Sequence, residues 1–99
     1  MSTIGQIVRD RKGRAGSNGS WRIEHGLNDN VELWHYSTLM LSWIDTSHGA
    51  CVTYISTGHG SVSDQGGMNQ AFRLLNLPYR FVRAGGAVVV DYTDGSLIW

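Results

Sequence analysis

The residues best suited to chemistry are concentrated between Thr57 and Asn69. This segment, TGHGSVSDQGGMN, holds four glycines, two serines, a histidine and an aspartate. Small residues let a ligand approach the backbone closely, and the first N–H groups of a helix lack partners within the helix. We therefore expect a binding site for a ligand or partner here. Its predicted residues are His59, Ser61, Ser63, Asp64, Gln65, Gly66, Gly67 and Asn69.

The same segment has a simpler interpretation as a capped helix start. Ser63 or Asp64 would accept from the first helical amides, and the glycines would only form a loop. The spacing matches neither the P-loop nor the dinucleotide-binding pattern, so it predicts no particular phosphate ligand. Both interpretations, a site and a cap, stay open.

Hydrolysis by a serine nucleophile is a further alternative. His59 could act as a base for Ser61 or Ser63, with Asp64 as the orienting acid. However, triad members usually converge from separate elements, and the Gly-x-Ser-x-Gly elbow is absent. We therefore expect no enzymatic activity and assign no catalytic residues.

The chain offers no recognisable metal site. Four histidines are present, none at the i, i+4 spacing of a helical zinc site, although His35 and His59 could share an ion with a distant aspartate. Cys51 is the only cysteine, which excludes a disulfide framework. We expect neither a metal nor a cofactor. The histidines are His25, His35, His48 and His59.

Charge leaves nucleic-acid binding as a second functional hypothesis. The formal net charge is zero, which does not favour a polyanionic partner. Nevertheless, four basic residues against Asp10 give the N-terminus a local excess, and aromatic residues beside arginines could stack on bases. The possible phosphate contacts are Arg9, Arg11, Lys12 and Arg14.

Hydrophobic patterning predicts an α+β domain spanning residues 1–99. An antiparallel sheet of about five to seven strands would carry one main helix, at about residues 64–76, in the order βββ(β)–α–βββ. Residues 9–20, basic and then Gly/Ser-rich, read as a flexible loop or arm. The predicted strands are Trp21–His25, Val31–Asp45 (one strand, or two with a bulge near Ser37–Thr38), Ala50–Ser56, Tyr79–Arg83, Ala87–Tyr92 and Ser96–Trp99.

The pattern also bears on location and assembly. The polar N-terminus resembles no signal peptide, and no apolar run is long enough to span a bilayer. We expect a cytoplasmic protein with no membrane partner. The segment Ser96–Trp99 could form an edge strand that pairs with a second copy, which makes a homodimer a further hypothesis.

Over about residues 31–92 the chain resembles a group of small accessory proteins of tailed actinobacterial phages. The resemblance implies location in the host cytoplasm and no assigned activity. A Thr/Ser-rich junction followed by a basic residue or histidine is common in the group; Asp64–Gly67 replaces it here. We expect an accessory protein that uses the Gly/Ser-rich junction and an aromatic sheet face to bind a host protein or sequester a small anionic molecule. The resembling motifs are His35-Tyr36-x-Thr38, Gly60-Ser-x-Ser-Asp64, Met68-Asn69 and Leu77-Pro-Tyr-Arg-Phe81.

Overall fold

The computed structural model describes residues 2–92 and confirms the predicted α+β class. Five antiparallel strands form one sheet in the order β1-β2-β3-β4-β5, and two more form a separate hairpin, β6-β7. The seven strands of residues 2–92 therefore divide between two sheets, whereas the sequence predicted one. The elements are α1 (Ile4–Asp10), β1 (Arg14–Ala15), β2 (Trp21–His25), β3 (Val31–His35), β4 (Thr38–Thr46), β5 (Gly49–Ile55), α2 (Val62–Leu74), β6 (Tyr79–Ala84) and β7 (Ala87–Tyr92), with short 3-10 turns at Ser17–Gly19 and Leu27–Asp29.

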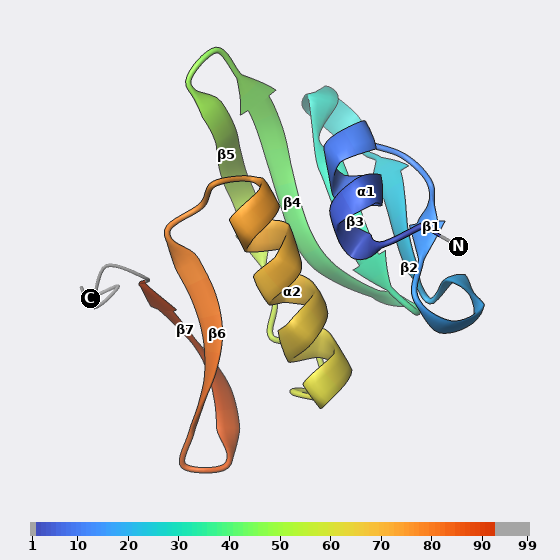
Figure 1. Cartoon of the computed structure of the whole chain (residues 1–99). Coiled ribbons are helices and arrows are strands. Elements are labelled where there is room, and N and C mark those ends of the chain that lie inside the picture. The colour runs from blue at the N-terminus through green and yellow to red at the C-terminus, as the bar shows by residue number, and fades with distance from the viewer. Residues whose placement is uncertain (1, 93–99) are drawn as a thin grey trace.

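Both helices lie on the same side of the five-stranded sheet (Figure 1). The apolar core forms between the helices and the sheet. Alternate residues of β2 and β3 point to the helix side of the sheet, and the i, i+3, i+4 stripe of α2 faces the sheet. Phe72 in that stripe is fully buried, and burial of such a side chain stabilises the fold by about 1.5–3 kcal/mol. The predicted helix stripe of Met68, Ala71, Phe72 and Leu75 is confirmed as buried.

The predicted segment Val31–Asp45 is two strands joined by a tight turn. Tyr36 has φ of 54°, a left-handed conformation that reverses the chain between β3 and β4. His35, the last residue of β3, is paired in register with Trp21 of β2. The turn therefore brings His35 to one end of the sheet, on the helix side.

Helix α2 starts earlier than the sequence suggested. Ser61, rather than Ser63 or Asp64, is the N-cap, and the helix includes Gly66 and Gly67. At Gly67 a Cβ atom would overlap the indole of Trp21. This close approach explains why a glycine, which weakens a helix, stands at this position.

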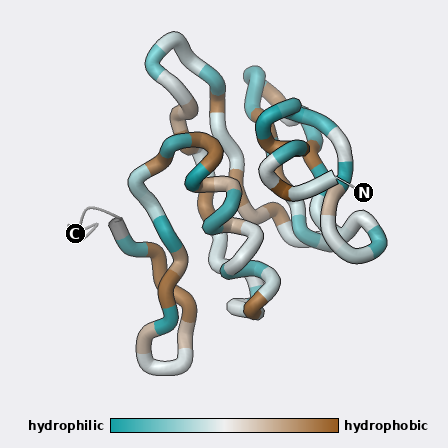
Figure 2. The backbone as a smooth tube through the Cα atoms, in the orientation of Figure 1, coloured by the Kyte–Doolittle hydropathy of each residue, from teal (hydrophilic) through white to brown (hydrophobic). Residues whose placement is uncertain are grey.

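The β6-β7 hairpin is held to α2 by amide side chains. Asn69 accepts from Phe81 N (2.7 Å) and donates to Phe81 O (3.1 Å), so it satisfies both polar groups of one strand residue. Gln65 adds a bond to the same carbonyl at 3.3 Å. Figure 2 shows the valine run of β7 and the facing part of β6 as hydrophobic. Within the hairpin, Phe81 and Val88 reach the core.

The N-terminal segment is more regular than predicted. Residues 4–10 form α1 and residues 14–15 pair with β2, so the predicted loop at residues 9–20 contains the end of a helix and a short strand. The predicted edge strand Ser96–Trp99 lies outside the described residues. Within residues 2–92, neither helix has the length and apolar character needed to cross a membrane.

Candidate functional site

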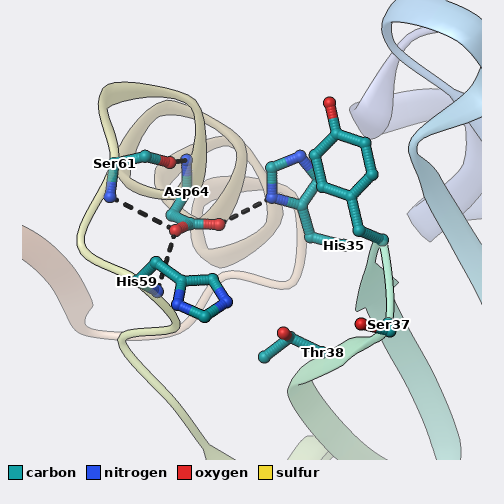
Figure 3. A pocket seen from close by; sticks show the side chains of 7 residues that line it. His35, Ser37, Thr38, His59, Ser61 and Asp64 are labelled. Atoms are coloured by element: carbon teal, nitrogen blue, oxygen red, sulfur yellow. Dashed lines mark hydrogen bonds and ion pairs between the residues drawn. The ribbon is translucent and has the colours of Figure 1, made fainter.

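The site is built around the carboxylate of Asp64, in the first turn of α2 (Figure 3). Its Oδ2 accepts hydrogen bonds from the backbone N–H groups of His59 (3.1 Å) and Ser61 (3.2 Å). Its Oδ1 accepts a hydrogen bond from Nδ1 of His35 at 2.6 Å. The Ser61 hydroxyl accepts from Asp64 N in return (3.0 Å), which completes a capping box. The carboxylate thus engages the amides of His59 and Ser61, so these two are not free for a ligand.

Asp64 is ionised despite being buried. Burial alone raises its pKa, but the hydrogen bonds from His35, Ser61 and His59 together outweigh burial and leave the pKa below its usual value. An ionised carboxylate can only accept hydrogen bonds. Nδ1 of His35 must therefore carry the proton in this contact.

His35 is held rigidly by its neighbours. Its imidazole stacks on the Trp21 indole with ring centroids 4.0 Å apart and planes 7° apart, and it also contacts the Tyr36 ring at 4.5 Å. The side chains of His35 and Asp64 are only 5% and 4% exposed. On the far side of the ring, Nε2 lies 3.5 Å from the hydroxyl of Ser63. Asp64, His35 and Ser63 therefore form one chain of polar contacts.

A pocket of about 390 Å³ opens beside this pair. Its volume is within the range of small-molecule sites. Two separate chain segments supply the walls: the end of β3 with the β3–β4 turn, and the continuous stretch from the loop before α2 into its first turn. The lining residues are His35, Tyr36, Ser37, Thr38, His59, Ser61 and Asp64.

A second hollow, of about 350 Å³, lies on the Ser63 side. Trp21, Gly66 and Gly67 contribute to its walls, together with the loop around Ser17. Tyr36 lines both hollows and is 66% exposed. Its backbone is fixed by bonds from its N–H to Ser20 O (2.8 Å) and from Arg22 to its carbonyl (2.5 Å), which support the left-handed conformation.

The structure brings together only part of the predicted site. His59, Ser61 and Asp64 line the first pocket, whereas Ser63, Gly66 and Gly67 line the second hollow. Gln65 and Asn69 do not contribute, because their amides bind β6. The backbone N–H of His59 donates a hydrogen bond to Asp64, and its exposed ring forms part of the wall of the first pocket. The imidazole next to Ser63 is that of His35 rather than that of His59.

Sequence reasoning missed the role of His35 and the turn after it. One signal was available: His35 follows Val31 and Leu33 in strict alternation, and both of these are buried. A histidine on a buried face requires a polar partner. The sequence did not show that this partner is Asp64, 29 residues away.

The other predicted chemistries find little support in the described residues. No group of three metal-binding side chains occurs there. Arg11 binds Asp45 through two bonds of 2.9 and 2.7 Å, and its hydrogen bonding lowers the pKa of Asp45. Arg9 pairs with Asp10, and Arg14 donates to Gly19 O, so most of the basic arm is already engaged, with Lys12 exposed.

The arginine and aromatic face is similarly engaged. Arg22 lies 5.0 Å over the Trp34 ring and pairs with Glu24, while Arg80 pairs with Asp91. These contacts leave less positive charge for a phosphate backbone than the sequence suggested.

Comparison of the chain with protein-family models, curated proteins and solved structures finds no match. The site's own geometry is therefore the basis for a functional proposal.

Proposed function

We propose that the protein acts by binding a small polar molecule in the pocket between the β3–β4 turn and the start of α2. The observation that carries this proposal is the concave shape: a hollow of about 390 Å³ between two chain segments, with hydroxyl, imidazole and carboxylate groups on its walls. Concave sites with a few convergent polar groups suit small molecules, whereas protein partners generally bind flatter surfaces. A sequestering role in the host cytoplasm agrees with the expected phage accessory protein.

The pocket walls favour a neutral polar ligand over an anion. Ser37, Thr38 and Ser61 provide hydroxyl groups, and His59 provides an imidazole that can donate or accept. The ionised group of the pocket is Asp64, whose negative charge repels an anion. The backbone amides of His59 and Ser61, which lie beside the pocket, are bonded to this carboxylate.

An NMR titration of the full chain tests the proposal. D-ribose and adenosine serve as neutral probes, and acetate and inorganic phosphate as anionic ones, each at millimolar concentration. We expect a neutral probe to shift the backbone amide signals of residues 35–38 and 58–61. Shifts confined to other residues, or no shift with any probe, would contradict the proposal.

A pocket-filling variant supplies the control. Ser37→Trp places an indole at an exposed position of the pocket wall and should abolish the shifts. Ser47→Trp, in the exposed β4–β5 turn away from the pocket, should leave them unchanged. Equal binding by both variants would show that the probe binds elsewhere.

A further inference from the structure

We propose that Ser63 and His35 form a second, catalytic site that hydrolyses small carboxylic esters, with Asp64 positioning the imidazole. The juxtaposition that carries this proposal is the unbroken series Asp64 Oδ1–His35 Nδ1 at 2.6 Å and His35 Nε2–Ser63 Oγ at 3.5 Å. A serine, an imidazole and a carboxylate in this order are the parts of a serine-hydrolase triad, which is recognised by geometry and roles. This activity goes beyond binding in the first pocket.

Asp64 gives His35 the orientation that a base requires. Because the ionised carboxylate accepts the Nδ1 proton, Nε2 is the nitrogen that lies next to the Ser63 hydroxyl and would take its proton. The stacked Trp21 prevents the ring from turning away. Asp64 also stabilises the imidazolium that forms when Nε2 takes a proton.

Ser63 is placed as a nucleophile rather than as a cap. Ser61 performs the capping, so the hydroxyl of Ser63 is not needed for the helix. Ser63 is exposed, and in the described part of the chain its hydroxyl contacts only His35. A separation of 3.5 Å is long for a hydrogen bond, but such contacts are often looser before substrate binds.

The start of α2 also offers donors for an oxyanion. Asp64 and Ser61 engage the amides of His59, Ser61 and Asp64, whereas the N–H groups of Val62 and Ser63 bond to no residue in the range 2–92. A nucleophile's own N–H is a common oxyanion donor, and the helix dipole favours negative charge at this end.

The reaction balances without a cofactor. Ser63 Oγ bonds to the ester carbonyl carbon as its proton moves to His35 Nε2. The bond from carbon to the leaving oxygen then breaks, and Nε2 returns the proton to release an alcohol. Water next attacks the acyl carbon, giving one proton to Nε2, and the acyl–Oγ bond breaks as Oγ recovers that proton. The carboxylic acid leaves, so ester and water become acid and alcohol.

The second hollow provides the approach to Ser63. It holds about 350 Å³, with Tyr36 and Trp21 as aromatic walls and Gly66 on the helix. A Cβ atom at Gly66 would meet no other atom within 4 Å, so this part of the helix surface is open. The available space suits a short acyl group.

Labelling with a fluorophosphonate, which phosphonylates activated serines, tests the nucleophile directly. We expect mass spectrometry of the treated full chain to find an adduct on Ser63. Hydrolysis of p-nitrophenyl acetate by Ser63→Ala should show a kcat/KM about 100-fold or more below wild type. Alanine suits this exposed helix position, so the variant should keep the wild-type Tm within a few degrees.

Ser47→Ala is the matched control, because Ser47 is an exposed serine that lines neither hollow. It should retain both the adduct and the turnover. No adduct on Ser63, or equal turnover by wild type and Ser63→Ala, would overturn the proposal. Asp64→Asn tests whether Asp64 positions the His35 imidazole. The variant should lower kcat with little change in KM, and a rise in KM with kcat unchanged would contradict that role.

Failure of this proposal is distinguishable from failure of the binding proposal. Ser63→Ala leaves the lining of the first pocket intact, so the NMR shifts of residues 35–38 should persist in it.

Discussion

Both helices begin with a capping box, but only the capping box of α2 also contacts the sheet. At α1, Thr3 and Gln6 form an exposed capping box with bonds of 3.1 and 2.8 Å. At α2, Ser61 and Asp64 form the same box, but Asp64 is buried and also bonds to His59 N and His35. A carboxylate at the third position therefore connects a helix start to the sheet, whereas a glutamine serves only its own helix.

Removing the two third-position side chains should separate these roles most strongly. Asp64→Ala leaves His35 and two amides without a buried partner, so we expect the free energy of unfolding to fall by about 3–5 kcal/mol. Gln6→Ala removes one exposed bond and should cost about 0.5–1 kcal/mol. Urea denaturation of both variants measures the difference, and similar losses would show that the Asp64 network adds nothing to capping.

The neighbouring glycines of α2 test its contact with the sheet. Gly67→Ala forces a methyl group into the Trp21 indole and should destabilise the fold by about 1–3 kcal/mol. Gly66→Ala has open space and should stabilise it by up to about 1 kcal/mol through better helix propensity. Thermal unfolding would reveal the opposite signs; two stabilising substitutions would mean that Trp21 can move freely.

Acid should weaken the start of α2 but not that of α1. The pKa of Asp64 is lower in the folded protein than its unfolded value of about 3.9, so its contribution is complete above that value and is lost as pH falls through the folded pKa. Gln6 does not titrate. We expect the free energy of unfolding to decline below about pH 4.

Asp64→Asn should reduce the slope of that decline, as measured by urea denaturation from about pH 3 to 6. Asp45→Asn provides a comparison, because the hydrogen bond from Arg11 lowers the pKa of Asp45 in the same direction. An unchanged slope in Asp64→Asn would assign the acid sensitivity to other carboxylates.

The smallest difference is expected at the caps themselves. Thr3→Ala and Ser61→Ala each remove one side-chain acceptor from a helix amide, and each should cost about 1 kcal/mol. Denaturation of the two variants should give values within a few tenths of each other. A much larger loss for Ser61→Ala would show that the capping hydroxyl also holds the Asp64 network in place.

Local patterns predicted much of the fold but not the assembly of the site. The stripe from Met68 to Leu75 and the alternation in Trp21–His25 each depend on the period of one element, so the sequence identified α2 and β2 correctly. The turn at Tyr36 was harder to predict, because a tyrosine with positive φ follows no common turn pattern. The pairing of His35 with Asp64 depends on how α2 docks, which no local period encodes.

The prediction at the junction named three residues of the polar cluster that the structure shows, but not its histidine. Ser61, Ser63 and Asp64 do converge with a histidine, but the histidine comes from β3 rather than from His59. Sequence proximity favoured His59, whereas the strand register brings His35 opposite Trp21 and towards the helix.

The sequential order of the sheet has a consequence for how this protein folds. Strands β1 to β5 pair only with their neighbours along the chain, and such short-range contacts form rapidly. The contact between His35 and Asp64 needs the loop between them to close and α2 to settle on the finished sheet. An intermediate with a complete sheet and an undocked helix would lack the buried hydrogen bond between His35 and Asp64 and the contact of Trp21 with Gly67. Signals from His35 and Trp21 would therefore report the last step of folding.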